Sequence, residues 1–340
     1  MSKAIPIFIY LLFFAQASLG QELAEKYFAK GVEFQELGVA ARALDYYTVA
    51  LEKNPDYREA RYNRAIVYFQ MQEYHKALFD VRTLIGKDPM DPDLYSLTGL
   101  IYAKLDQAEK ADYYINRAID IDDQPIFHLR KADILLQKGQ PEKVFNELSK
   151  ALEDSFLEAS ALELQANAYI DLHQPNQALG TYTRLINLEP RPEYYFNRGL
   201  LRKQKKDFKG ACKDFAEASK TSFFEDALEE LIRCQWKSED FEGAEQTAKN
   251  GIIHFPNNPT FYLFSGLVTL KKGKRDLAFQ WFDRAEQLGM KSPELYINKG
   301  LALIHTDKDK AKDLFLLALK LDPENLAAQH NLDLLKSGVE

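Results

Sequence analysis

Histidines, cysteines and carboxylates are the side chains in this sequence that could perform chemistry. The six histidines lie far apart in the sequence, and none forms an HExxH motif or another spacing typical of a metal site. No GxSxG elbow, P-loop or GxGxxG motif occurs. Adjacent carboxylates such as Glu229 and Glu230 are typical of solvated helix faces. The sequence therefore predicts no catalytic residue, no metal site and no cofactor, and it favours a protein that is not an enzyme.

The composition indicates a folded chain with a substantial core. Hydrophobic residues make up 46% of the 340 residues and charged residues 28%. The net charge of -7 argues against nucleic acid as a partner, because binding to phosphates requires a dominant positive field.

The first twenty residues differ from the rest of the chain. Lys3 gives a basic start, residues 5–14 form a nearly unbroken apolar run, and residues 15–20 are mostly small. This layout is typical of a secretory signal peptide, with cleavage after Ala17 or Gly20. An uncleaved anchor is the less favoured alternative, because the run is shorter than the roughly 20 residues of a membrane-spanning helix. We therefore predict an exported protein, either periplasmic or secreted.

From residue 24 onward the sequence repeats with a period of about 34 residues. A small residue recurs in each unit, a second follows about twelve residues later, and a bulky residue follows four residues after that. Such spacings place side chains on one face of a helix. The first series of small residues is Gly31, Ala65, Gly99, Ala132, Ala166, Gly199, Gly266 and Gly300, and the seventh unit has Ile232 at this position instead.

This pattern resembles the tetratricopeptide repeat, a helix-turn-helix unit. The first unit supplies Tyr27, Gly31, Phe34, Ala43, Tyr47, Ala50 and Pro55 in the register of that repeat. The resemblance implies an all-α fold, a right-handed α-solenoid of about nine tandem repeats within residues 21–325. The repeats start near residues 24, 58, 92, 125, 159, 192, 225, 259 and 293. Residues 326–340 should form a capping helix and tail, which cover the apolar face of the last repeat.

In this family the first helix of each unit lines a concave surface, and the resemblance places mostly apolar residues of this chain there. A continuous exposed apolar strip usually marks an interaction surface. The predicted partner-binding residues are Phe28, Tyr62, Ile66, Phe69, Leu100, Leu129, Leu136, Ile170, Phe196, Leu200, Arg233, Trp236, Leu267 and Leu270. Trp236 beside Arg233 is the strongest candidate anchor, because Trp and Arg are enriched at interface hot spots. Alternatively, neighbouring turns or self-association cover the strip.

The resemblance also brings the two cysteines near one another. It places Cys212 early in the second helix of the sixth unit and Cys234 late in the first helix of the seventh. Such helices pack antiparallel, so the cysteines form either a disulfide, which export permits, or two separate buried thiols.

Basic residues gather where first helices end in the C-terminal half. They either complement the helix dipoles or form an edge for an acidic partner or anionic headgroups. These residues are Lys203, Lys205, Lys206, Lys237, Lys271, Lys272, Lys274 and Arg275.

We therefore predict an exported scaffold that binds a peptide or helix of a partner protein. Membership of a cell-envelope assembly and peripheral membrane association are further expectations. The alternative is a glycan-binding protein that uses Tyr62, Phe69 and Trp236 as stacking platforms.

Overall fold

The structure is a computed structural model, and it describes residues 4–220 and 225–337. Within these ranges all regular secondary structure is helical, in nineteen helices arranged as tandem pairs. This confirms the predicted all-α fold of tandem helix pairs. The chain divides into two compact units, residues 1–174 and 175–340, and each is described by itself.

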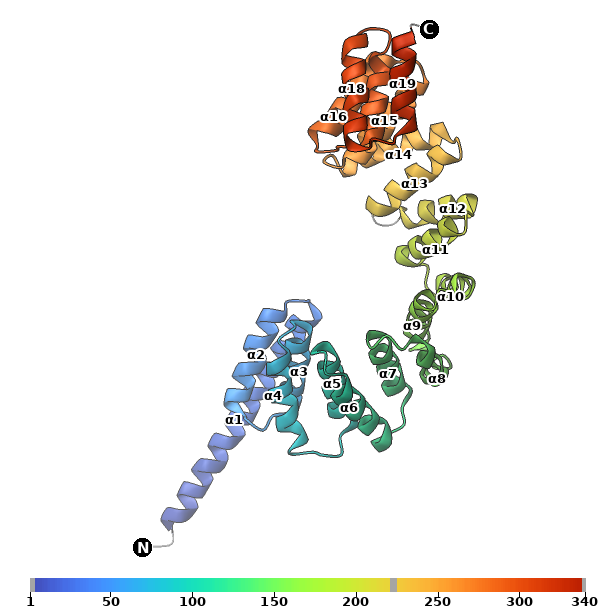
Figure 1. Cartoon of the computed structure of the whole chain (residues 1–340). Coiled ribbons are helices and arrows are strands. Elements are labelled where there is room, and N and C mark those ends of the chain that lie inside the picture. Colours follow the sequence, from blue (N-terminus) through green and yellow to red (C-terminus); the bar gives the residue numbers. More distant parts are fainter. Residues whose placement is uncertain (1–3, 221–224, 338–340) are drawn as a thin grey trace. The chain divides into compact units, whose positions relative to one another are not determined.

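Unit 1 contains nine helices in the part that the structure describes (Figure 1). Odd-numbered helices are first helices of repeats and even-numbered helices are second helices. They are α1 (Ala4–Glu36), α2 (Ala40–Lys53), α3 (Arg58–Gln70), α4 (Tyr74–Ile85), α5 (Pro92–Lys104), α6 (Ala108–Ile121), α7 (Pro125–Gln137), α8 (Pro141–Ala151) and α9 (Glu158–Asp171).

Unit 2 contains ten helices within residues 175–220 and 225–337. The last helix packs on the preceding pair, since its Ala328 and Leu332 are buried in the same cluster as Phe315. The helices are α10 (Pro175–Leu188), α11 (Pro192–Gln204), α12 (Phe208–Ala218), α13 (Glu225–Lys237), α14 (Phe241–His254), α15 (Pro259–Lys271), α16 (Arg275–Gln287), α17 (Pro293–Leu303), α18 (Lys308–Leu321) and α19 (Leu326–Ser337).

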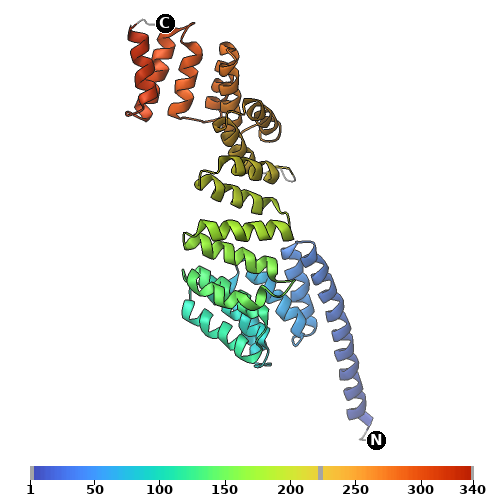
Figure 2. The same ribbon diagram turned by 90° about the vertical axis from the view of Figure 1, so that its right-hand side faces the viewer.

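Helix α1 is much longer than its partner α2 and includes the predicted signal segment. Its backbone is continuously helical, and its N-terminal half extends beyond α2 in both views (Figures 1 and 2). Its C-terminal half belongs to the first repeat, where Ala24 is fully buried and Gly31 lies against the ring of Tyr47. No helix among the described residues has the length and apolar character needed to cross a membrane.

Complementary side-chain sizes set the crossing of the two helices in a repeat. A Cβ atom added at Gly266 would lie 2.4 Å from the ring of Phe282, which is fully buried. Glycine on the first helix therefore admits an aromatic ring from the second. In two repeats whose first helix carries alanine, the second helix carries a smaller aliphatic residue in the same core cluster. The two examples are Ala65 with Val81 and Ala132 with Leu148.

The seventh repeat inverts this arrangement. Its first helix, α13, carries Ile232 at the crossing position, and its second helix, α14, carries Ala248. Both side chains are fully buried in one core cluster. Exchanging the large and small partners between the helices keeps the filled volume similar, which cores tolerate well. The repeat therefore keeps its helix pair although it departs from the common pattern.

The turn inside each of the first eight repeats contains one residue with a positive φ angle. Only glycine adopts this left-handed backbone without a steric cost, and five of the eight turns use another residue. The positions are Gly38, Gln72, Asp106, Gly139, His173, Lys206, Glu239 and Gly273.

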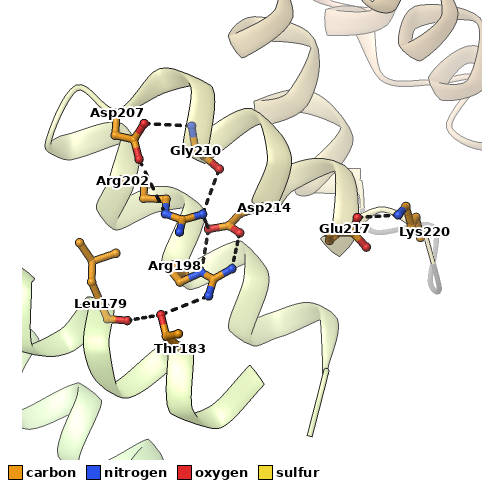
Figure 3. Close-up of polar contacts among 9 residues, drawn as sticks. All are labelled: Leu179, Thr183, Arg198, Arg202, Asp207, Gly210, Asp214, Glu217 and Lys220. Atoms are coloured by element: carbon orange, nitrogen blue, oxygen red, sulfur yellow. Dashed lines mark hydrogen bonds and ion pairs between the residues drawn. The ribbon is translucent and has the colours of Figure 1, made fainter. Parts of the chain in front are cut away.

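A buried ion-pair cluster joins three helices of unit 2 (Figure 3). The Asp214 carboxylate on α12 accepts hydrogen bonds from Arg198 Nη2 at 2.7 Å and Arg202 Nη1 at 2.8 Å, both on α11. Arg198 Nη1 also donates to Thr183 Oγ1 on α10 at 3.2 Å. Because Asp214 is only 2% exposed, the two arginines supply the counter-charge that its burial requires.

Unit 1 contains an equivalent cluster. Asp80 on α4 accepts hydrogen bonds from Arg64 Nε and Nη2, each at 2.7 Å, and Arg64 Nη1 donates to Thr48 Oγ1 on α2 at 3.3 Å. Arg61 adds a longer contact of 3.3 Å to Asp80. In both units the arginine precedes the aspartate by sixteen residues, so the same three positions of the repeat form the cluster.

Candidate functional site

The predicted partner-binding residues of unit 1 lie on its first helices, where most of them cover the core. Phe28 contacts the rings of Tyr47 and Tyr57, with centroids 5.8 and 5.1 Å apart. Burial raises the pKa of the Tyr62 phenol above its ordinary value. The half-buried residues are Phe28, Tyr62, Ile66, Phe69, Leu100, Leu129 and Leu136, and Ile170 is exposed.

The predicted residues of unit 2 differ more in accessibility. Leu200 and Leu267 occupy the same position in two repeats, yet Leu200 is 38% exposed and Leu267 only 5%. Leu267 therefore belongs to the core and does not contribute a surface for a partner. The half-buried residues are Phe196, Arg233, Trp236 and Leu270.

Trp236 and Arg233 line one pocket of about 180 Å³, which we call the Trp236 pocket. Its walls come from the first helices α11, α13, α15 and α17 and from the start of α12. Four successive first helices thus contribute to one cavity within unit 2. The lining residues are Lys203, Phe208, Glu230, Arg233, Cys234, Trp236, Lys237, Phe264 and Glu294.

Aromatic contacts hold Trp236 in place. Its ring meets Phe264 edge-on, with centroids 6.1 Å apart, and meets Phe241 in the same way at 5.1 Å. The guanidinium of Arg233 lies over the ring of Phe264, 5.8 Å from its centroid. Aromatic pairs with this geometry add stability beyond the burial of their area. The pocket therefore presents a fixed aromatic wall with a cation beside it.

Charged side chains surround this aromatic wall. Lys203 forms an ion pair with Glu230 across the pocket, and Arg233 approaches Glu229 at 3.3 Å. Lys237 Nζ lies 5.8 Å from the centroid of the Phe208 ring. This mixture of an apolar wall and a charged rim suits a side chain that is itself apolar and carries polar neighbours.

A disulfide forms part of the same region. Cys212 on α12 and Cys234 on α13 are bonded, with Cα atoms 5.6 Å apart. Of the two alternatives that the sequence allows, the structure therefore contains the bridge. Cys234 lines the Trp236 pocket, so the disulfide ties a pocket wall to the preceding repeat.

Two further pockets occur among the described residues. One of about 250 Å³ in unit 1 lies beside Ala111, Ile134 and Lys138. An open pocket of about 580 Å³ in unit 2 is lined by Glu225, Glu229 and residues 254–260. No group of three or more His, Cys, Asp or Glu side chains in the described residues is placed to hold a metal ion. Sequence reasoning identified neither pocket.

Family models of the tetratricopeptide repeat match three stretches of the chain, residues 36–105, 92–125 and 229–293. These matches cover repeats in both units and agree with the helix pairs found there. Tetratricopeptide repeats are therefore present in both units. This fold suggests a protein–protein interaction scaffold.

Curated relatives match over longer or shorter parts of the chain. The TPR repeat-containing protein MJ1428 of Methanocaldococcus jannaschii is 21% identical over 86% of this chain and 55% of its own length. Photosystem I assembly protein Ycf3 of Prochlorococcus marinus is 35% identical over 23% of this chain and 47% of its own length. The chain thus spans about half the length of these two relatives.

Solved structures with a similar fold include the C-terminal part of a TPR repeat-containing protein from Cytophaga hutchinsonii. It is 17% identical, with a TM-score of 0.48, and the match covers 80% of this chain and 99% of that one. The TPR protein TTC0263 of Thermus thermophilus is 22% identical, with a TM-score of 0.45, over 49% and 92% of the two chains.

Proposed function

We propose that this chain is an exported, non-enzymatic scaffold that binds a peptide or helix of a partner protein through its first helices, within an assembly at the cell envelope. The Trp236 pocket carries the proposal. It combines Trp236, Phe264 and Arg233 in one cavity, and residues of these types dominate protein interface energetics. The fold supports it further, because a row of first helices offers an extended surface for a partner segment.

Two features support export. The first is the basic, apolar and small-residue succession of residues 1–20. The second is the disulfide between Cys212 and Cys234, since disulfides persist in oxidising compartments and are rare in the cytosol. Intact mass measurement of the chain recovered from a secreting host tests this proposal. We expect a chain that starts after Ala17 or Gly20, whereas a chain that retains the apolar run would contradict export by cleavage.

Binding is tested by crosslinking and pull-down from the native host. Trp236→Ala combined with Phe69→Ala should abolish recovery of the partner. A matched control exchanges aromatic residues on second helices, Phe79→Ala on α4 and Tyr113→Ala on α6, which are 67% and 65% exposed. If both double variants recover the partner equally, the first helices are not the binding surface. Retention on a glycan array, without protein crosslinks, would instead support the glycan-binding alternative.

A further inference from the structure

The positive charge of this acidic chain is concentrated at one edge of unit 2. The turns at residues 204–207, 237–240 and 271–274 join first to second helices, and together they carry six lysines and three carboxylates. We define the basic ridge as the exposed lysines of these turns that have no carboxylate partner among the described residues. They are Lys205, Lys206, Lys237, Lys271 and Lys274.

Other contacts orient three of these ammonium groups without neutralising them, and one of the three is Lys205, which donates to Asn176 Oδ1. Lys237 lies over the ring of Phe208, and Lys271 lies over the ring of Phe241 with Nζ 4.2 Å from its centroid. Phe208 and Phe241 are the first residues of α12 and α14. Each ring thus positions a lysine from the first helix of the next repeat. The ammonium group keeps its positive charge at this edge of the unit.

Helix dipoles alone do not account for the basic ridge. Dipoles favour cations at the end of every helix, so the equivalent turns of unit 1 should be basic as well. Those turns, at residues 70–73, 104–107 and 137–140, carry only two lysines and two carboxylates. The excess of cations is therefore specific to repeats six to eight.

The basic ridge is continuous with the Trp236 pocket, because Lys237 belongs to both. A volume of about 180 Å³ accommodates one large apolar side chain, and the cations at its edge attract carboxylates. Glu294 also lines the pocket and would repel a polyphosphate that entered it, whereas Glu230 is paired with Lys203. A peptide presents an apolar side chain and acidic neighbours on one strand, which fits both parts of the surface.

We propose that the Trp236 pocket and the basic ridge together bind an acidic segment of a partner protein. One large apolar side chain of that segment enters the pocket, and Asp or Glu residues beside it pair with the ridge lysines. This inference rests on the proposed scaffold function and adds the chemistry of the ligand to it.

The test selects ligands for the full chain from a random peptide library displayed on phage. Selected peptides should be enriched in Asp and Glu flanking Trp, Phe or Leu. For synthetic copies of them, Trp236→Ala should raise Kd at least tenfold, which is the loss typical of a hot spot. The combined change Lys237→Gln, Lys271→Gln and Lys274→Gln should raise Kd about tenfold at low salt and much less at high salt, because screening weakens exposed charges.

Matched controls are Tyr113→Ala for the aromatic change and Lys143→Gln for the charge change, since both side chains are exposed on second helices of unit 1. Neither should alter Kd. Neutral or basic peptides that still require Trp236 would overturn this inference and leave the scaffold function standing. Failure to select any peptide that depends on Trp236 or Phe69 would overturn both.

A membrane surface is the competing class of ligand. Co-sedimentation with vesicles of phosphatidylcholine and phosphatidylglycerol tests it directly. If vesicle binding is lost in the triple lysine variant while peptide affinity is unchanged, the basic ridge binds lipid headgroups and the acidic-peptide assignment is wrong. Absence of vesicle binding together with the salt-sensitive loss of peptide affinity is the result that we expect.

Discussion

Replacing Asp214 with alanine should destabilise unit 2 more than the loss of any exposed ion pair. The carboxylate is 2% exposed and is bonded to Arg198 and Arg202, so its removal leaves Arg198 without a carboxylate partner and Arg202 with only Asp207, 3.8 Å away. Removing one partner of a buried ion pair costs about 3–5 kcal/mol. The arginine side chains are 12% and 28% exposed, which lets water solvate them in part. We therefore expect a loss of about 2–3 kcal/mol in the free energy of unfolding.

Urea unfolding followed by far-UV circular dichroism measures this loss. If the free energy of unfolding falls by about 2 kcal/mol per molar urea, the midpoint should drop by about 1 M. Glu217→Ala is the matched control, because its pair with Lys220 on the same unit is 44% and 61% exposed (Figure 3). That change should cost less than about 0.5 kcal/mol. Equal midpoints for the two variants would refute the argument from burial.

A compensating variant separates lost pairing from lost packing. Replacing the buried ion pairs with apolar side chains, Arg198→Met, Arg202→Met and Asp214→Leu, removes all three charges of the cluster and leaves only the exposed Asp207 nearby. Apolar replacement of a buried ion pair is often neutral or stabilising, so most of the loss should be recovered. Asp80→Ala should have the equivalent effect on unit 1, because Asp80 is fully buried and bonded in the same way.

Three further predictions concern other parts of the fold. Burial raises the pKa of the Glu147 carboxyl, but hydrogen bonds from Lys131 and His128 outweigh burial, so the net pKa is lowered. The ionised Glu147 carboxylate should therefore stabilise the fold fully above the ordinary glutamate pKa of about 4.3, and this contribution should disappear as the pH falls further. Glu147→Gln should therefore lower the urea midpoint at neutral pH but not in strong acid. The double change Cys212→Ser and Cys234→Ser should lower the free energy of unfolding by about 3 kcal/mol, because the disulfide no longer restricts the unfolded chain. Free-thiol labelling of the denatured wild-type chain should detect no thiol. Gly266→Ala should destabilise unit 2 by about 1–2 kcal/mol through its clash with Phe282, and Phe282→Leu should relieve part of that cost in a double-mutant cycle.

The helix pairs could be predicted because the residues that form them recur. Small and bulky positions repeat at fixed spacing, so one packing rule recurs in successive repeats. The exception at Ile232 was visible in the sequence, but its explanation was not. Only the structure shows that Ala248 on the facing helix makes room for the larger side chain.

The exposure of single side chains was harder to predict than the pairing of helices. It depends on neighbouring side chains, which the position of a residue within its repeat does not specify. Leu200 and Leu267 share a register position, yet α15 is enclosed over most of its length and α11 is not. A signal was present, since residues 259–271 are apolar on nearly every face, as in a helix surrounded by protein. The Arg198–Asp214 cluster was missed because two single charges sixteen residues apart do not stand out in a sequence rich in both signs.

Departures from the repeat locate the site better than the repeat itself. Packing constrains the small and bulky positions in every unit, whereas the other positions are free to differ where a partner binds. Both tryptophans, both cysteines and the excess of basic turn residues fall within repeats six to eight. The structure brings Trp236, Cys234 and Lys237 to one pocket. Because the other repeats fold without these residues, their presence at one pocket supports the proposal that this pocket recognises a ligand.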